Sequence, residues 1–188
     1  MAMILPATLV EAPNGPIKLA PLLAEHVGAS YQSWLADPVV TRFTETRAEK
    51  RSLDEIKAYV TTVNESPQDQ IWRVLLDDRH VGNIKLNHIQ LQHKRSTVGI
   101  MLGDRSVWGK GVAARAIDLL ARSAFASGRI HKLAAGIYAS NLASLGAFAK
   151  ANFVIEARLV RHRYFQDGFE DEIIMARFGE PPAADRAQ

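Results

Sequence analysis

A glycine-rich run in the second half of the chain has the residue types expected of an anion site. The run Trp108-Gly-Lys-Gly-Val-Ala113 lies between a strand-like segment, Ser96–Gly103, and a helix-like segment, Gly111–Gly128. Its two glycines let the backbone turn tightly and approach a ligand closely. The first amides of the helix have no intrahelical partner and share the positive end of the helix dipole. This arrangement predicts a phosphate or pyrophosphate site.

Two common nucleotide motifs do not fit this run. A Walker A loop has Ser or Thr after its lysine, but Lys110 is followed by Gly111, so the hydroxyl that binds magnesium is missing. A dinucleotide fingerprint has a third glycine where this chain has Ala114, and it lies at the first strand–helix turn of its domain. The glycine pair alone would be explained equally well by a simple tight turn.

A second strand–helix unit follows, and it favours a ligand site over a simple tight turn. Leu133–Ser140 is strand-like, Asn141-Leu-Ala-Ser144 opens a helix that extends to Lys150, and Phe153 follows. This order and spacing resemble the GNAT superfamily of acetyl-CoA-dependent N-acetyltransferases, and within it the RimJ/RimL branch. The residues that carry the resemblance are Val98-Gly99-Ile100, Trp108–Ala113, Asn141, Ser144, Lys150 and Phe153. It covers roughly residues 15–178.

The order of elements favours an α/β (α+β) fold with a mixed, mostly antiparallel sheet of six or seven strands and helices on both faces. The resemblance implies the same fold, with a V-shaped split between two central parallel strands, which we expect at Thr97–Leu102 and Leu133–Ser140. Residues 1–188 are expected to form one such domain, with a core of about 15–178 and a disordered tail at 179–188. The other predicted elements are a strand at Ile17–Leu19, helices at Leu22–Ala36 and after the capping box Ser52–Glu55, and hairpins at Ile71–Leu76/Val81–Leu91 and Ile155–Phe165/Phe169–Phe178.

Acetyl-CoA is the co-substrate that the resemblance implies. Its pyrophosphate would lie on the amides of Gly109, Lys110, Gly111, Val112 and Ala113, and its pantetheine would pair with the backbone of Ile100, Met101 and Leu102. Three further residues each have two possible roles. Trp108 is a core residue or a ligand contact. Asn141 is a helix N-cap, a pantetheine contact or both. Lys150 faces solvent or contacts a phosphate.

Acetylation of an amine requires a neutral amine, an oxyanion site and a proton for the departing thiolate. The resemblance places Ser144 near the thioester sulfur, although it could equally be a helix-start hydroxyl. Many relatives have a tyrosine acid where this chain has Phe148, and many have a glutamate where it has Thr97. No side chain is therefore a secure base, and a water relay through Ser144, Thr97, Tyr138 or His88 is the alternative.

Substrate contacts are harder to assign. The acceptor-facing segments are expected at Val39–Lys50, Val81–Leu91 and His162–Glu170, with His88 and His162 as candidate contacts. Arg158, Arg161, His162 and Arg163 form a basic cluster that could meet a phosphate or an acidic partner, or could simply be a solvated strand face.

Composition excludes several other functions. The chain has 188 residues, 47% of them apolar, a net charge of +3 and no cysteine, which excludes disulfides, thiolate nucleophiles and iron–sulfur clusters. Its histidines form no H-x-x-x-H pair, so we expect no metal, and a serine-hydrolase elbow is missing. We expect a cytoplasmic monomer or homodimer with no nucleic-acid or membrane partner.

The sequence therefore predicts an acetyl-CoA-dependent N-acetyltransferase that acts on a primary amine, either a protein N-terminus or a small molecule, by direct attack in a ternary complex. The alternative is a non-catalytic acyl-CoA sensor on the same fold, which the residues Thr97 and Phe148 motivate.

Overall fold

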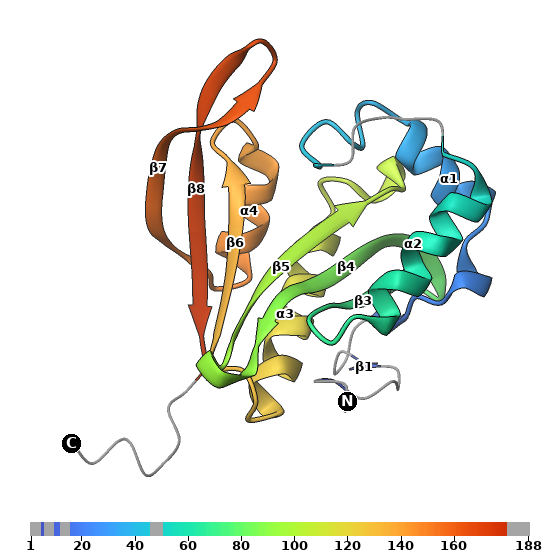
Figure 1. Ribbon diagram of the computed structural model, residues 1–188, viewed down its shortest axis with the longest axis horizontal. Coiled ribbons are helices and arrows are strands. Elements are labelled where there is room, and N and C mark those ends of the chain that lie inside the picture. The colour runs from blue at the N-terminus through green and yellow to red at the C-terminus, as the bar shows by residue number, and fades with distance from the viewer. Residues whose placement is uncertain (1–4, 6–9, 12–15, 46–50, 180–188) are drawn as a thin grey trace.

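One mixed β-sheet organises the protein in the computed structural model, which describes residues 5, 10–11, 16–45 and 51–179 (Figure 1). The strands lie in the order β1-β2-β3-β4-β5-β6-β8-β7, and every neighbouring pair is antiparallel except β5 and β6. Their bounds are Val10–Glu11 (β1), Ile17–Pro21 (β2), Gln70–Leu76 (β3), Arg79–Gln90 (β4), Arg95–Leu102 (β5), Lys132–Tyr138 (β6), Val154–Phe165 (β7) and Gly168–Phe178 (β8). The predicted mixed sheet is confirmed, and the two-residue β1 extends it to eight strands.

Helices cover both faces of the sheet, as predicted. Helices α1 (Ala29–Ala36) and α2 (Leu53–Glu65) pack on one face, and α3 (Val112–Ala126) and α4 (Leu142–Lys150) pack on the other (Figure 1). Each pair of helices encloses its own hydrophobic cluster. The sheet therefore separates a larger core beneath α3 from a smaller one beneath α1 and α2.

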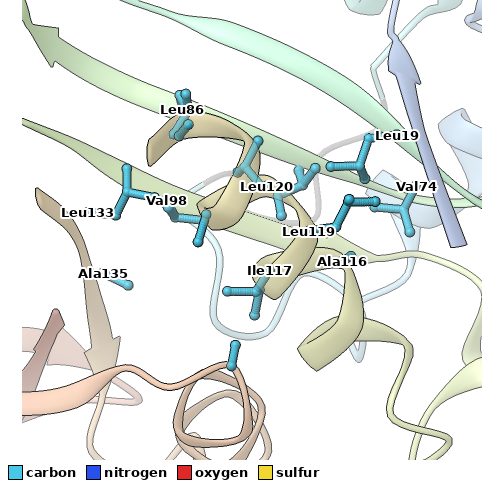
Figure 2. Close-up of a cluster of buried hydrophobic side chains, with 14 of the residues drawn as sticks. Leu19, Val74, Leu86, Val98, Ala116, Ile117, Leu119, Leu120, Leu133 and Ala135 are labelled. Atoms are coloured by element: carbon cyan, nitrogen blue, oxygen red, sulfur yellow. The ribbon is translucent and has the colours of Figure 1, made fainter. Parts of the chain in front are cut away.

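Helix α3 is the main support of the sheet. Ala116, Ile117, Leu120 and Ala124 recur at helical spacing and are fully buried. Figure 2 shows the first three of them facing side chains of strands β2 to β6, such as Leu19, Val74 and Leu133. The two alanines let the helix lie close to the sheet, and each large side chain contributes about 1.5–3 kcal/mol by its burial. This packing fixes the start of α3 relative to the end of β5.

Several predicted helix and hairpin boundaries are formed by local hydrogen bonds and turns. The Ser52 hydroxyl accepts a hydrogen bond from the Glu55 amide at 3.2 Å, and the Glu55 carboxylate accepts one from the Ser52 amide at 2.7 Å. The hairpin turns use residues with positive φ, namely Asp77 and Asp78 between β3 and β4, and Gln166 and Asp167 between β7 and β8. Two residues with positive φ are typical of tight hairpin turns.

The predicted continuous helix over Leu22–Ala36 is wrong. The chain forms a short 3₁₀ helix at Ala24–His26, and α1 begins only at Ala29. Gly28 precedes α1 in an extended conformation, with φ −135° and ψ −173°, so the two helical segments cannot join. The tail that we expected at 179–188 lies outside the described residues except for Gly179.

Candidate active site

The two parallel strands pair only at one end. The register joins Arg95 to Lys132, Ser96 to Leu133 and Thr97 to Ala134, and the strands then diverge (Figure 1). Strand β5 continues to Leu102 and β6 to Tyr138 without pairing with each other. The predicted V-shaped split is therefore present at the predicted place.

The hydrogen-bond pattern of β5 decides which of its backbone groups face the split. The Gly103 amide donates to the Val81 carbonyl of β4 at 3.0 Å. Alternate residues of an antiparallel strand bond to the same neighbour, so Met101 also bonds to β4, while Ile100 and Leu102 face the other way. Ile100 and Leu102 thus present backbone donors and acceptors to the split, and Met101 contributes its side chain to the cavity there.

The glycine run has the geometry of an anion site. Gly109 and Gly111 have φ of +74° and +76°, and a Cβ atom added at either would meet no atom within 4 Å. Gly111 is the N-cap of α3 and offers no side-chain cap, so the amides of Val112 and Ala113 point outward without a protein acceptor from that residue. A phosphate placed there would meet both these donors and the helix dipole.

Trp108 bridges the glycine run and β5. Its indole Nε1 donates to the Leu102 carbonyl at 3.0 Å, and the side chain is 40% exposed. The Arg105 guanidinium lies 5.8 Å from the ring centroid. Trp108 is therefore not a core residue. It occupies one of the carbonyls at the end of β5 and leaves its ring surface open to a ligand.

The start of α4 forms another wall of the split. The Asn141 side chain accepts a hydrogen bond from the Ser144 amide at 3.1 Å, so Asn141 is the N-cap of this helix. Both residues also line the cavity. Phe148 is 2% exposed and packs edge-to-face on Phe153, with ring centroids 5.0 Å apart, and it supplies no proton donor. Lys150 is exposed in the last turn.

A cavity of about 300 Å³ fills the split. Its two sides are formed by Val98–Met101 of β5 and Ala135–Tyr138 of β6. One end is formed by Asn141, Ser144 and Phe148. The remaining wall comes from the face that α1 and α2 cover. Its polar members are Tyr31, Thr44, Arg51, Tyr59, Asn83, Lys85 and Asn87.

An ionic network closes the cavity at the end of β6. Arg163 donates to the Glu45 carboxylate at 2.7 Å and to the buried Glu172 carboxylate at 2.5 Å. The Tyr138 hydroxyl lies 3.5 Å from Glu45, and the Phe43 ring lies 5.8 Å from the Tyr138 ring. The hydrogen bonds with Glu172 raise the pKa of Arg163, against the smaller effect of burial, so this cation stays charged. The network attaches the connection after α1 to β6, β7 and β8.

A family comparison decides what this arrangement is. The model of the acetyltransferase (GNAT) domain matches residues 17–154, which is most of the chain. The protein belongs to the GNAT acetyltransferase family. A search of curated protein sequences finds no match.

Solved structures share the fold of this acetyltransferase at low sequence identity. The RimL ribosomal L7/L12 alpha-N-protein acetyltransferase in complex with coenzyme A has a TM-score of 0.83 at 16% identity, over 92% of this chain and 98% of that one. The spermidine N-acetyltransferase from Vibrio cholerae in complex with CoA and spermine has a TM-score of 0.77 at 16% identity, over 87% and 95%. The microcin C7 self-immunity acetyltransferase MccE in complex with acetyl-CoA and AMP has a TM-score of 0.75 at 17% identity, over 88% and 93%.

Three residues predicted for catalysis or acceptor binding, namely Thr97, His88 and His162, lie outside the cavity. Thr97 is the last β5 residue paired with β6, and its hydroxyl donates to the Asn87 carbonyl at 3.2 Å. His88 is exposed, with Nδ1 at 3.5 Å from the Thr97 hydroxyl. His162 is exposed, with Nε2 at 3.3 Å from Glu172. Their roles in catalysis or acceptor binding stay predictions, and the geometry adds no support to them.

The basic cluster on β7 is mostly paired within the domain. Arg158 bonds to Asp171, and Arg163 bonds to Glu45 and Glu172. The Arg161 guanidinium lies over the Phe169 ring, 5.6 Å from its centroid. These contacts favour a structural role for the cluster over an anionic partner.

Sequence reasoning missed most of the polar wall. Asn83, Lys85 and Asn87 alternate with apolar residues along β4, so their side chains share one face of the sheet. That alternation was a usable signal within the segment Val81–Leu91. Tyr31 and Glu172 gave no comparable signal, because their importance depends on contacts between distant segments.

Within the described ranges, no group of three or more His, Asp or Glu side chains could hold a metal ion. Nor does any helix in this part of the chain have the length and apolar character needed to cross a membrane.

Proposed function

We propose that this acetyltransferase moves the acetyl group of acetyl-CoA to a primary amine by direct attack in a ternary complex. The observation that carries the proposal is the split itself. It leaves the backbone of β5 beyond Thr97 unpaired with β6, and Ile100 of this segment lines a cavity that Ser144 and Tyr138 also line. The structural neighbours include enzymes named for acetylating a protein N-terminus and spermidine, which supports an amine acceptor.

The residues present fit acetyl-CoA. The open space at Gly109 and Gly111 leaves room for a pyrophosphate over the first turn of α3, where Gly109, Gly111, Val112 and Ala113 supply amide donors and Lys110 supplies a cation. The backbone of Ile100 and Leu102 would pair with the pantetheine like an added strand. Asn141 can serve as both an N-cap and a pantetheine contact, because its amide nitrogen is not used by the cap. Lys150 is exposed, and its ammonium group either faces solvent or contacts a phosphate.

The chemistry requires one bond to form and one to break. The lone pair of the neutral amine attacks the thioester carbonyl, the C–N bond forms, and the C–S bond breaks as the thiolate leaves. The backbone amide of Ile100 is the proposed oxyanion donor. Ser144 or Tyr138 supplies a proton to the thiolate, and water accepts the proton that the new ammonium group loses.

Tyr138 is suited to remain a proton donor. Burial is the largest cause that raises the pKa of its phenol, and the nearby Glu45 carboxylate adds to the effect. The phenol therefore stays protonated at neutral and moderately alkaline pH. Because Phe148 cannot donate a proton, Tyr138 and Ser144 are the two candidates on the cavity wall.

The finer assignments follow from the same reasoning. We place the protein in the RimJ/RimL-type branch, which the TM-score of 0.83 to RimL supports. We propose a single catalytic domain that works as a monomer or homodimer in the cytoplasm, where acetyl-CoA is made, and that needs no metal ion.

The amine dependence of thiol release tests the proposed function. Release of CoA from acetyl-CoA should increase when a suitable amine is added, and the rate should rise about tenfold per pH unit below the pKa of the amine, because only the neutral amine attacks. A reaction without acceptor is the control. Since the pKa of Tyr138 is raised, the rate should not fall again before about pH 10. Tight CoA binding with no acceptor-dependent release across protein N-termini, polyamines and amino sugars would support the sensor instead.

Ser144 and Tyr138 can be separated by substitution. A hydroxyl that acts only as thiolate charge develops should affect kcat more than the KM for acetyl-CoA. We expect Ser144→Ala to lower kcat by up to about 100-fold. If Ser144→Ala retains the wild-type kcat, Ser144 is a helix-start hydroxyl, and Tyr138→Phe should then show the loss.

A further inference from the structure

The cavity wall on the side of α1 and β4 is rich in hydrogen-bond donors and cations. This part of the wall is formed by Arg51, Lys85, Asn83 and Tyr31. None of the cavity-lining residues in the described ranges is an aspartate or glutamate. A wall whose lining residues include two cations and no carboxylate is suited to an anionic group rather than to a second amine, even though Asp69 pairs with Lys85.

Asn83 is a buried polar residue of this wall. It is 6% exposed, and its Nδ2 atom makes no hydrogen bond of normal geometry among the described residues, although its amide interacts with the Tyr31 hydroxyl and opposes the rise in the pKa of that phenol. Its Oδ1 atom lies 2.9 Å from Nε2 of His80. Burial lowers the pKa of His80, so the imidazole is neutral at pH 7 and donates from Nε2. His80 thus fixes the orientation of the Asn83 amide, and Asn83 is one of the residues that line the cavity. A buried unpaired donor is costly unless a ligand accepts from it.

Two neighbours of Asn83 add a hydrogen-bond donor and a cation to the same wall. Burial raises the pKa of Tyr31 to about 12, so its hydroxyl stays protonated and can donate. Lys85 follows Asn83 by two residues on the same face of β4, and its ammonium group is held by Asp69 at 3.3 Å and over the Tyr59 ring at 5.7 Å. These contacts keep the cation at the cavity instead of letting it extend into solvent.

We propose that the acceptor amine also carries an oxyanion, a carboxylate or a phosphate, which Asn83, Lys85 and Arg51 bind while the amine points into the split. This inference rests on the proposed function. Lys85 lies opposite Gly99 on β5, the strand that borders the split. One to two strand spacings, roughly 5–10 Å, therefore separate the oxyanion from the amine. That span exceeds the separation of amine and carboxylate in an α-amino acid and suits an ω-amino acid or a small amino phosphate, whereas the second ammonium group of a polyamine would meet Lys85 and Arg51.

Matched acceptor pairs test the proposal on the wild-type enzyme. We would compare ω-amino acids with their carboxamides, and O-phosphoethanolamine with ethanolamine, with spermidine as a cationic amine. Each kcat/KM is divided by the fraction of neutral amine, because the paired compounds differ in amine pKa. The oxyanion member of at least one pair should be favoured about 10- to 100-fold, as expected for one or two charge-assisted hydrogen bonds. The pair that shows the preference identifies carboxylate or phosphate. Equal use of both members, or preference for spermidine, overturns the proposal and leaves the transferase function standing.

A substitution then locates the preference. Lys85→Met should reduce the ratio of kcat/KM for the oxyanion member over its neutral partner about 10-fold or more. Lys18→Met is the matched control, because Lys18 also lies in a strand and pairs with an aspartate, Asp78 at 2.8 Å, but lies outside the cavity lining. The control should keep the wild-type ratio. An unchanged ratio in Lys85→Met overturns the assignment of this wall.

Product binding gives a readout that does not need turnover. In calorimetry with CoA present, N-acetyl amino acids or N-acetyl-O-phosphoethanolamine should bind about 10-fold more tightly than their neutral counterparts, and Lys85→Met should remove the difference. Binding without this difference overturns the proposal, and so does failure of every oxyanion probe to bind. If the oxyanion products bind selectively but no amine promotes CoA release, the proposed function fails while the oxyanion site stands.

Discussion

Gly111→Asp should weaken CoA binding about 100-fold or more without unfolding the protein. Gly111 is the N-cap of α3, and aspartate is a favoured N-cap residue. Its carboxylate would accept hydrogen bonds from the amides that we assign to the pyrophosphate, and it would repel the phosphate charge. The fold should survive, because a Cβ atom added at Gly111 meets no atom within 4 Å and aspartate tolerates a positive φ better than most residues.

Calorimetry with CoA measures this loss, and circular dichroism checks the fold. Gly128→Asp is a matched control, since Gly128 has φ +68°, has no atom within 4 Å of an added Cβ, and lies just past the other end of α3. The control should bind CoA like the wild type. A folded Gly111→Asp protein with unchanged affinity contradicts the pyrophosphate site.

The second large effect should come from Gly82→Ala on β4. A Cβ atom at Gly82 would lie 2.4 Å from the Met101 carbonyl oxygen and 2.8 Å from the Leu102 Cα, and both are backbone atoms of β5. The strands must therefore move apart, which we expect to cost about 2–3 kcal/mol and to lower Tm by roughly 5–10 °C. Because β5 presents Ile100 and Leu102 to the split, CoA affinity should also fall.

Thermal unfolding followed by circular dichroism tests this prediction. Gly99→Ala is the control for stability, because Gly99 lies on β5 and its added Cβ would be 3.4 Å from the Asn87 side chain, an ordinary contact. Its Tm should stay within about 2 °C of the wild type. A Gly82→Ala protein as stable as Gly99→Ala would show that β4 and β5 are not packed in this register.

Features set by neighbouring residues were predictable from the sequence. The capping box at Ser52–Glu55, the N-cap at Asn141 and the glycine turn before α3 each depend on backbone chemistry within four or five residues. The split was predicted from the resemblance to the GNAT superfamily, which implies an opening between the two central parallel strands. The helix over Leu22–Ala36 failed because its apolar spacing continues across Gly28, where the backbone is extended.

The acceptor wall was not predictable to the same degree. Tyr31, Tyr59 and Asn83 come from α1, α2 and β4, and they acquire their surroundings only when the sheet forms. His88 and His162 were singled out for the chemistry of imidazole, yet both side chains lie outside the cavity. The chemistry of a residue type does not tell which face of a strand its side chain occupies. Bulges make the face harder to predict, because they shift the strand register, and a bulge lies near each of these histidines.

Transfer of a labelled acetyl group most directly tests the central claim, that the split brings acetyl-CoA and an amine together for direct attack. The enzyme is loaded with radiolabelled acetyl-CoA and mixed with an amine from the panel, and both protein and amine are counted over time. The label should move to the amine only when the amine is present, and the protein should never retain it, since the chain has no cysteine and the mechanism needs no covalent intermediate. Label on the washed protein would contradict direct attack, and label that stays on CoA with every amine would contradict the transferase function.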